Sequence, residues 1–228
     1  FVTDKISDRR LFLSNRGAPY FFPLHLYSDK PKLRQLITDS SKQERTPNFT
    51  DEFLQAIKSA LGTEPTPEEI FYYIYAVLYS PTYRKRYEEF LKIDFPRVPL
   101  PTDYEQFKNL SELGKELVEL HLLKHPLLSE TGVGFPIAGT REVEKVRYDE
   151  ENERVYFNKT QYFEGISKEV WEYRIGAYQV LAKYLKDRKK RELSLEEIEH
   201  YMRVAKAIGR TIEVQKKVEE VFGVVAMG

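Results

Sequence analysis

The chain has 228 residues, enough for one large domain or two small ones with a substantial buried core. Its 36 basic and 36 acidic residues give a formal net charge of zero, which excludes a molecule-wide field that attracts nucleic acid or an anionic membrane. The lack of cysteine excludes disulfides, thiolate nucleophiles and zinc sites built on sulfur. With no apolar run near the roughly 18 residues of a membrane span and no apolar signal-peptide core, we expect a cytoplasmic protein.

The N-terminal part of the chain predicts a strand followed by a loop. Residues 1–27 hold the short apolar run "APYFFPLHLY", which has prolines at both ends and favours a strand. Residues 28–50 turn polar and predict an exposed loop. The sequence begins at Phe1 rather than at methionine, so we expect a fragment of a longer polypeptide.

Two helices with strong start signals come next. Thr50 is placed to cap a helix over 51–61, which Gly62 ends. In "TPEEIFYYIYAVLYS", Thr66 caps the helix, a proline occupies the first turn and Glu69 completes a capping box. The predicted buried stripe of this second helix consists of Ile70, Ile74, Val77 and Leu78.

A proline-rich strip separates the next two predicted helices. Ser80 and Pro81 start a helix through "TYRKRYEEFLKI" after a kink or break. "IDFPRVPLP" then predicts extended chain at low entropy cost, that is, a rigid spacer. Thr102 and Glu105 form a further capping box that opens a long helix to His121. The apolar face of this helix holds Phe107, Leu110, Leu113, Leu117 and Leu120.

The pattern changes to period-two alternation after glycines and a proline in 131–136. "EVEKVRYDEENERVYFNKTQYF" predicts a β-hairpin around the polar "DEEN" turn. Helices resume with "SKEVWEY" and "AYQVLAKYLKDR", and Ser194 with Glu197 caps the last helix. The sequence therefore predicts an α+β fold, rich in helix with a small sheet. We expect residues 1–130 and residues 131–228 to form two parts of one structural unit.

No complete active site can be recognised in the sequence. His121 and His125 have the spacing of a metal pair, but Leu122 stands where a metalloprotease needs glutamate and Pro126 ends the helix. We favour histidines that face the last helix carbonyls. Asp187 with the two residues after it imitates the acid-x-Lys of nucleases, yet it lies at a helix end without a second acid. We predict no catalytic residue, metal or cofactor for this chain.

Two local clusters remain as binding candidates. "KYLKDRKKREL" concentrates cations around Asp187 and predicts a positive corner that binds phosphates; the alternative is a solvated helix end. "NKTQYFEG" offers Lys159 as a donor, the amide of Gln161, which suits adenine, and Tyr162 as a stacking ring. The alternative for this second stretch is ordinary decoration at a strand end.

Long stretches of the sequence resemble the C-terminal specificity domain of Type ISP restriction-modification enzymes. They are "PEEIFYYIYAVLYSPTYRKRYEEFLKIDFPRVPLP", "LGKELVELHLL", "VEKVRYDEENERVYFNKTQYFEGISKEVWEYRIGAYQVLAKYLKDRK" and "LSLEEIEHYMRVAKAIGRTI". Together they cover most of 67–212, and Ser7-Asp8-Arg9 with "FPLHLY" match more weakly.

The resemblance implies a target-recognition domain that binds double-stranded DNA beside the methyltransferase domain of the same parent chain. It also implies that S-adenosylmethionine, ATP and magnesium belong to domains outside this chain. A rigid spacer suits such a domain, because bases are read while an adenine is flipped into a neighbouring cleft.

Two sets of residues carry the binding hypothesis. For base contacts we predict Lys159, Gln161 and Tyr162, together with Arg141 or Arg147 near the hairpin. For phosphate contacts we predict Arg174, Lys183, Arg188, Lys189 and Arg191. The alternative function is a helical module that docks on a methyltransferase or helicase domain and contacts DNA little; the neutral charge and the apolar helix faces favour it.

Overall fold

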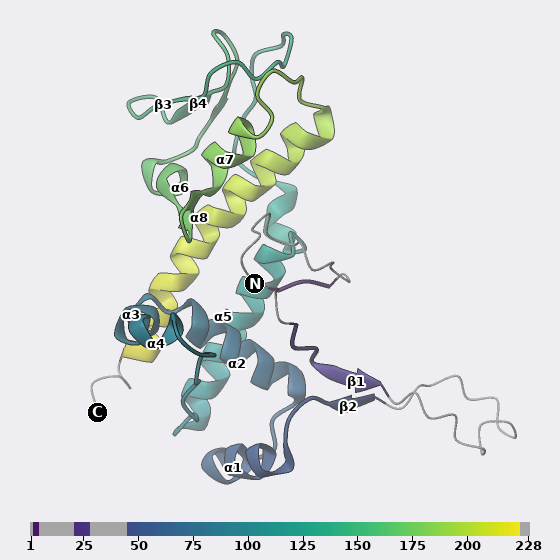
Figure 1. Cartoon of the computed structure of the whole chain (residues 1–228), viewed down its shortest axis with the longest axis vertical. Coiled ribbons are helices and arrows are strands. Elements are labelled where there is room, and N and C mark those ends of the chain that lie inside the picture. Colours follow the sequence, from purple (N-terminus) through teal and green to yellow (C-terminus); the bar gives the residue numbers. More distant parts are fainter. Residues whose placement is uncertain (1, 5–20, 28–44, 224–228) are drawn as a thin grey trace, which may run out of the picture. The chain divides into compact units, whose positions relative to one another are not determined.

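A computed structural model describes residues 2–4, 21–27 and 45–223 of the chain (Figure 1). The predicted match at Ser7-Asp8-Arg9 and the loop expected over 28–44 lie outside the described residues. Helices dominate, and the strands are short and antiparallel, so the fold is α+β as the sequence predicted. The elements in chain order are β1 (His25–Tyr27), β2 (Arg45–Pro47), α1 (Asp51–Leu61), α2 (Pro67–Tyr79), α3 (Pro81–Arg86), α4 (Glu88–Leu91), α5 (Tyr104–His121), the short 3-10 helix η2 (Pro126–Ser129), β3 (Arg147–Asp149), β4 (Arg154–Tyr156), β5 (Tyr162–Glu164), α6 (Lys168–Glu172), β6 (Arg174–Ile175), β7 (Tyr178–Gln179), α7 (Val180–Lys186) and α8 (Leu195–Gly223).

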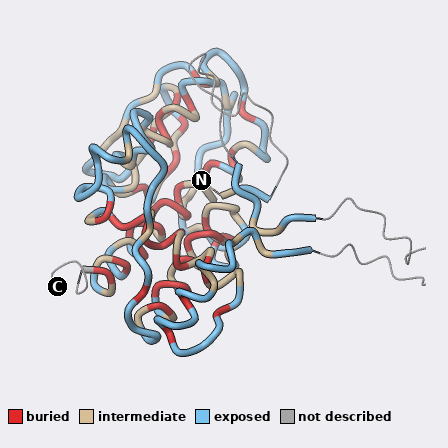
Figure 2. Tube along the Cα trace, turned by 60° about the horizontal axis from the view of Figure 1, so that its bottom comes forward, coloured by how far each residue is buried: buried red, intermediate tan, exposed pale blue. Residues whose placement is uncertain are grey.

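The described residues form two compact units. The C-terminal unit consists of 116–220 together with residue 2, and the N-terminal unit consists of the described residues of 3–115 together with 221–223. The boundaries fall within α5 and near the end of α8. The sequence pattern had suggested a division after residue 130. Buried and exposed positions alternate along the helices, as amphipathic helices require (Figure 2).

Local caps define the helices of the N-terminal unit. The Thr50 hydroxyl accepts a hydrogen bond from the Phe53 amide, and Gly62 ends α1 in the left-handed region at φ 70°. The capping box of α2 is complete, because Thr66 accepts from the Glu69 amide and Glu69 accepts from the Thr66 amide. These predictions are confirmed. The predicted stripe of α2 is confirmed in part: Ile70 and Val77 are buried, Ile74 and Leu78 are half-buried, and Tyr73 is buried although it was not predicted.

Three details of the N-terminal unit differ from the sequence prediction. Residues 45–47 form β2, which pairs antiparallel with β1, where a loop was predicted. The helix after Pro81 is broken at Tyr87 into α3 and α4. The cap of α5 is Asp103 rather than Thr102, because the Asp103 carboxylate accepts from the Gln106 amide at 2.8 Å. Strand pairing depends on contacts outside a short sequence window, whereas the Asp103 cap is a contact within one helical turn.

Tyrosine hydroxyls anchor the proline-rich strip. Tyr73 donates to the carbonyl of Pro99 at 3.0 Å and Tyr83 donates to the carbonyl of Arg97 at 2.9 Å. Nearby, α2 and α5 approach so closely that a Cβ at Gly114 would lie 1.9 Å from the Tyr72 carbonyl oxygen. The strip is therefore fixed to the helices of its own unit at two points.

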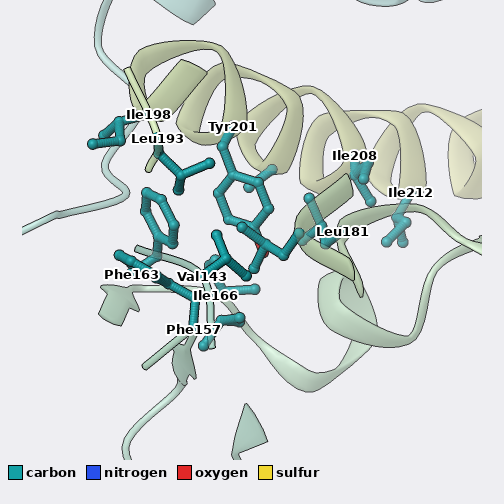
Figure 3. Close-up of a cluster of buried hydrophobic side chains, with 13 residues drawn as sticks. Val143, Phe157, Phe163, Ile166, Leu181, Leu193, Ile198, Tyr201, Ile208 and Ile212 are labelled. Atoms are coloured by element: carbon teal, nitrogen blue, oxygen red, sulfur yellow. The ribbon is translucent and has the colours of Figure 1, made fainter. Parts of the chain in front are cut away.

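A three-stranded antiparallel sheet, β3-β4-β5, covers the core of the C-terminal unit. The predicted hairpin is confirmed, with Tyr148 opposite Val155, and β5 adds a third strand that was not predicted. In Figure 3, Tyr201 points from α8 toward the sheet, and its ring centroid lies 4.3 Å from that of Phe163. The helices α6 and α7 lie alongside α8 in the same unit (Figure 1). The buried core holds Val143, Val155, Phe157, Phe163, Ile166, Leu181, Leu185, Leu193, Ile198, Tyr201, Ala205, Ile208 and Ile212.

The last helix begins as predicted. Ser194 accepts from the Glu197 amide, and the Glu197 carboxylate accepts from the Ser194 amide, which completes the capping box of α8. A two-stranded hairpin, β6-β7, was not predicted and lies between α6 and α7. None of the helices in the described ranges is long and apolar enough to cross a membrane.

Candidate nucleic-acid interface

The sheet of the C-terminal unit has one buried face and one outward face. Val155 and Phe163 are fully buried and directly opposite each other on β4 and β5. Side chains alternate along a strand, so the neighbours of these two residues point away from the core. The outward face therefore consists of two cross-strand rows, Arg147–Tyr156–Tyr162 and Asp149–Arg154–Glu164.

The first row is an array of arginine and tyrosine side chains. The guanidinium of Arg147 lies over the Tyr156 ring, 4.2 Å from its centroid. The rings of Tyr156 and Tyr162 have centroids 5.0 Å apart, and the guanidinium of Arg154 lies 4.4 Å from the Tyr162 centroid. Cation–π contacts of this kind hold a guanidinium plane while its N–H groups remain at the edge. We call Arg147, Tyr156, Tyr162 and Arg154 the arginine–tyrosine face.

The second row is more acidic and more strongly paired. Arg154 also approaches Glu164, with 3.5 Å between Nη2 and Oε2, and the pKa of Arg154 is raised, first by a hydrogen bond with Tyr156. The carboxylate of Asp149 accepts from the amide and the side chain of Asn152 in the adjoining turn. The outward face thus has an aromatic, cationic row at one end and an acidic row beside the 149–153 turn.

Two predicted base contacts in the turn before β5 have different positions. Lys159 is exposed and lies at the same end of the sheet as the first row. Gln161 is buried, with 1% of its surface exposed. Its amide donates to the Ile137 carbonyl and accepts from the Arg141 amide and from Asn158. Gln161 therefore joins loops inside the protein, and this placement argues against the predicted base contact.

Arg141 connects the sheet to the positive corner of the molecule. It adopts a left-handed conformation at φ 59°, and its guanidinium pairs with Glu192. The backbone of 141–143 bonds to that of 190–193, including Leu193 to Arg141 and Lys190 to Val143. The structure thus brings together two stretches that the sequence offered as separate clusters.

The arginines of the positive corner are held by a carboxylate of α8. Arg188 and Arg191 both donate to Oε1 of Glu197, at 3.0 and 2.5 Å. These bonds, led by that of Arg191 and supported by the Ser194 amide, lower the pKa of Glu197 to about 2. Arg188 also lies over the Tyr184 ring at 3.6 Å from its centroid. Both predicted phosphate contacts are therefore engaged within the chain.

The lysines of the corner differ in their partners. Lys183 pairs with Asp187 at 2.7 Å, and its ammonium lies 5.4 Å from the Tyr178 ring centroid. Lys186, Lys189 and Lys190 are exposed, and none forms an ion pair with a residue that the structure describes. These three cations are the part of the corner most available to an anionic ligand.

Arg174 lies on the β6-β7 hairpin rather than on a helix. Its side chain is exposed and donates to the Ala177 carbonyl at 3.0 Å, which closes the hairpin around Gly176. Tyr178, on the partner strand, is 59% exposed. The hairpin thus adds one cation and one ring next to Lys183.

Tyr156 and Arg154 were missed by the sequence analysis, although both belong to the outward face. The signal was present, because Val155 and Phe157 are apolar and their alternation places positions 154 and 156 on the opposite side. Applied to β5, the same rule places Gln161 on the buried face with Phe163, opposite to the outward face of Tyr162. Alternation alone could therefore have assigned both faces.

The two histidines considered as a metal pair have structural partners in the described residues. His121 Nε2 lies 3.1 Å from the Thr211 hydroxyl, and His125 accepts from the Leu127 amide. Within the described part of the chain, no group of three or more potential ligands is arranged to hold a metal ion. A cavity of about 710 Å³ is lined by Arg210 and its partners Glu116 and Glu213, and contains none of the predicted site residues.

The described residues thus form an α+β domain with an arginine–tyrosine sheet face and a lysine-rich corner. The chain belongs to the family of Type ISP C-terminal specificity domains, whose family model matches residues 1–217. No curated protein matches the sequence.

Solved structures that share the fold include three proteins in complex with DNA or a DNA mimic. The ATP-dependent Type ISP restriction-modification enzyme LlaBIII bound to DNA has a TM-score of 0.64 at 19% identity over 86% of this chain. The DrdV–DNA complex has a TM-score of 0.59 at 21% identity over 79%, and a nuclease-deletion mutant of the Type ISP enzyme LlaGI with a DNA substrate mimic has 0.55 at 22% over 76%. The chain spans only 14% to 20% of the length of these proteins.

Proposed function

We propose that this chain recognises a target sequence in double-stranded DNA and positions it for domains of a longer restriction-modification polypeptide. Its membership of the Type ISP specificity family carries this proposal. The structures that share its fold are of proteins bound to DNA or to a DNA mimic, which supports DNA as the partner. Methyl transfer and ATP hydrolysis, with S-adenosylmethionine, ATP and magnesium, then belong to other domains of that polypeptide in the cytoplasm.

The two surfaces of the C-terminal unit have different parts in this function. The arginine–tyrosine face reads bases, because arginine edges and aromatic rings offer directed hydrogen bonds and stacking. A major groove about 12 Å wide admits a two-stranded ribbon, and the β3-β4 hairpin, which bears Arg147 and Tyr156, is an antiparallel ribbon at the edge of the sheet. The lysines of the corner bind phosphates, which position the duplex without reading its sequence.

The proposed phosphate contacts start with the exposed lysines. Lys186, Lys189 and Lys190 can each replace a counterion without breaking a described ion pair. Arg188 and Arg191 must first exchange Glu197 for phosphate, and Lys183 must exchange Asp187. Phosphate binding by these three residues is therefore weaker than their charge suggests. Arg174 extends this surface from the β6-β7 hairpin.

Salt dependence of duplex binding tests the proposal. The affinity of the 228-residue chain for a labelled duplex should fall linearly on a plot of log K against log salt. Lys186→Glu with Lys189→Glu should weaken binding to all duplexes by roughly 10- to 100-fold at low salt. Lys115→Glu with Lys217→Glu makes the same change of net charge at exposed helix positions and should leave binding near that of the wild type. Equal losses in both variants would contradict a localised phosphate surface.

A second candidate function is docking on a neighbouring domain, such as the methyltransferase domain of the same parent chain. Exposed apolar residues of the N-terminal unit favour it, since Phe90 and Ile93 are 71% and 84% exposed. Phe22 and Phe95 form an edge-to-face pair with centroids 5.4 Å apart and are 72% and 54% exposed. Docking of this surface is compatible with DNA recognition by the other unit.

The two candidates predict different outcomes. A module that only docks shows no duplex binding at any salt concentration, whereas a recognition domain binds and loses affinity as salt rises. Phe90→Ser with Ile93→Ser should weaken association with a separately expressed methyltransferase domain and leave duplex binding by this chain unchanged.

A further inference from the structure

Arg147 differs from every other arginine of the C-terminal unit. Seven of the eight arginines in 116–220 donate side-chain hydrogen bonds within the chain. Their acceptors are carboxylates or backbone carbonyls. Arg147 is exposed, and its guanidinium makes no hydrogen bond to any residue in the described ranges. It is the one arginine among residues 116–220 whose N–H groups all lack a described hydrogen-bond partner.

The guanidinium of Arg147 is nevertheless held in place. It lies over the Tyr156 ring at 4.2 Å, and Tyr156 packs in turn against Tyr162. Stacking restrains the plane of the guanidinium and leaves the N–H groups at its edge directed outward. Less side-chain entropy is then lost when a ligand binds, which favours a partner that needs two parallel hydrogen bonds.

Two acceptor groups in duplex DNA match such a fork: a phosphate, and the N7 and O6 atoms of guanine. The surroundings of Arg147 favour guanine. The adjacent row on the same face, Asp149–Arg154–Glu164, has one more carboxylate than cation, and this net negative charge repels a phosphate backbone. Against base edges the same carboxylates can accept hydrogen bonds from the amino groups of cytosine or adenine.

We propose that Arg147, held over Tyr156, reads one guanine in the major groove, so that the target sequence of this domain contains a G·C pair fixed by this residue. The inference rests on the proposed function and deepens it. Tyr156 acts as a positioning residue, since it orients the guanidinium without needing to contact the base. The phenol hydroxyl has no part in this, because the ring face makes the contact.

Selection from duplexes with a randomised window tests this assignment. The wild-type chain should enrich a motif with an invariant guanine. Arg147→Ala should make that one position degenerate and retain the rest of the motif, with affinity for the wild-type site reduced roughly 10- to 100-fold. Tyr156→Phe should keep the guanine, whereas Tyr156→Ala should weaken its enrichment. Because Arg147 is exposed, circular dichroism and thermal unfolding should show an unchanged fold in Arg147→Ala.

A modified base then identifies the atoms that are read. Replacing the selected guanine by 7-deazaguanine removes N7 and should weaken wild-type binding about tenfold or more, with no further loss in Arg147→Ala. Arg147→Lys, which keeps the charge and loses the fork, should retain less than half of the preference for guanine.

The outcomes separate this inference from the proposed function. A wild-type motif that is unchanged in Arg147→Ala overturns the inference alone. Uniform weakening of all duplexes by Arg147→Ala, with a smaller salt slope, assigns the residue to a phosphate and also overturns it. If the wild-type chain enriches no sequence and binds no duplex, the proposed function fails, and the inference fails with it.

Discussion

The arginine–tyrosine face and the positive corner offer cations in opposite ways. The corner has the densest run of positive charge in the sequence, yet Arg188 and Arg191 share Glu197, and Lys183 pairs with Asp187. The sheet face contributes Arg147, whose guanidinium is stacked and makes no described hydrogen bond. The number of cations in a stretch of sequence is therefore a poor guide to their availability. Pairing within the fold decides which cations can bind a ligand.

The largest expected effect comes from a substitution in the hydrophobic core that packs against the buried face of the sheet. Phe163→Ala removes a fully buried ring that packs against Tyr201 and Phe157, and should destabilise the protein by about 3–5 kcal/mol. Urea denaturation measures the loss. DNA binding through the sheet face should weaken more than binding through the corner, because Phe163 is next to Tyr162 on β5 and supports the sheet from its buried side. Unchanged stability would contradict the assigned faces of β5.

Gln161→Ala separates a structural amide from a base-reading amide. The substitution leaves the Ile137 carbonyl and the Arg141 amide without their partner, and should cost about 2 kcal/mol of unfolding free energy. The sequence preference of binding should stay the same once the fraction of folded protein is taken into account. Thr160→Ala, at the exposed neighbouring position, is the control for stability. A changed preference at unchanged stability would restore the base contact expected from the sequence.

Glu197→Gln tests whether ion pairing with the Glu197 carboxylate weakens DNA binding by Arg188 and Arg191. Glutamine also serves in a capping box, so α8 should keep its start while Arg188 and Arg191 lose their shared carboxylate. Affinity for duplexes of any sequence should rise roughly 3- to 10-fold at low salt. Glu196→Gln removes the same charge from the neighbouring exposed position and should change affinity less. Equal effects of the two variants would mean that only net charge matters.

The ion pairs of Glu197 should also make the stability of the protein depend on pH in the acid range. The pKa of Glu197 is lowered from 4.5 to about 2 in the folded protein, so the unfolded chain binds the proton more readily. The stabilisation is fully present above about pH 4.5 and is lost as the pH falls through about 2. Between these values Glu197→Gln should show a shallower loss of stability than the wild type in urea titrations at stepped pH. Parallel curves for the two proteins would contradict the pairing.

The smallest expected effect comes from the core. The Tyr201 hydroxyl is buried and has no hydrogen-bond partner among the described residues. Tyr201→Phe removes this unpaired group and keeps the ring, so stability should be unchanged or rise by up to about 1 kcal/mol. Thermal unfolding checks the sign, and a clear loss of stability would show that the hydroxyl has a partner, such as a buried water.

Local signals in the sequence located the long helices, although not the cap of α5, and did not predict most of the small sheets. Thr50, Thr66 and Ser194 cap helices as predicted, because a cap depends on residues within one turn. The strand β2 and the hairpin β6-β7 were missed, since two- or three-residue strands exist only through a pairing partner. The long-range connection of 141–143 with 190–193 has no local signal either.

The candidate site was found in part for the same reason. Arg147 and Tyr162 were chosen from their chemistry, and the register of the sheet places both in one row. Tyr156, which joins them, was missed because its role depends on cross-strand neighbours. The residue types of Arg188 and Arg191 showed their positive charge. Their common partner Glu197 was not predicted, because the only local signal at Glu197 is the capping box.

The salt dependence of binding by two variants tests the contrast between the two surfaces most directly. Duplex affinity is measured over a series of salt concentrations for Arg147→Ala and for Lys186→Glu with Lys189→Glu. We predict that the lysine variant lowers the slope of log K against log salt by about 2 and keeps the sequence preference. Arg147→Ala should keep the slope and lose preference at one base pair. A reduced slope with unchanged preference in Arg147→Ala, or an altered preference in the lysine variant, would contradict the division of roles.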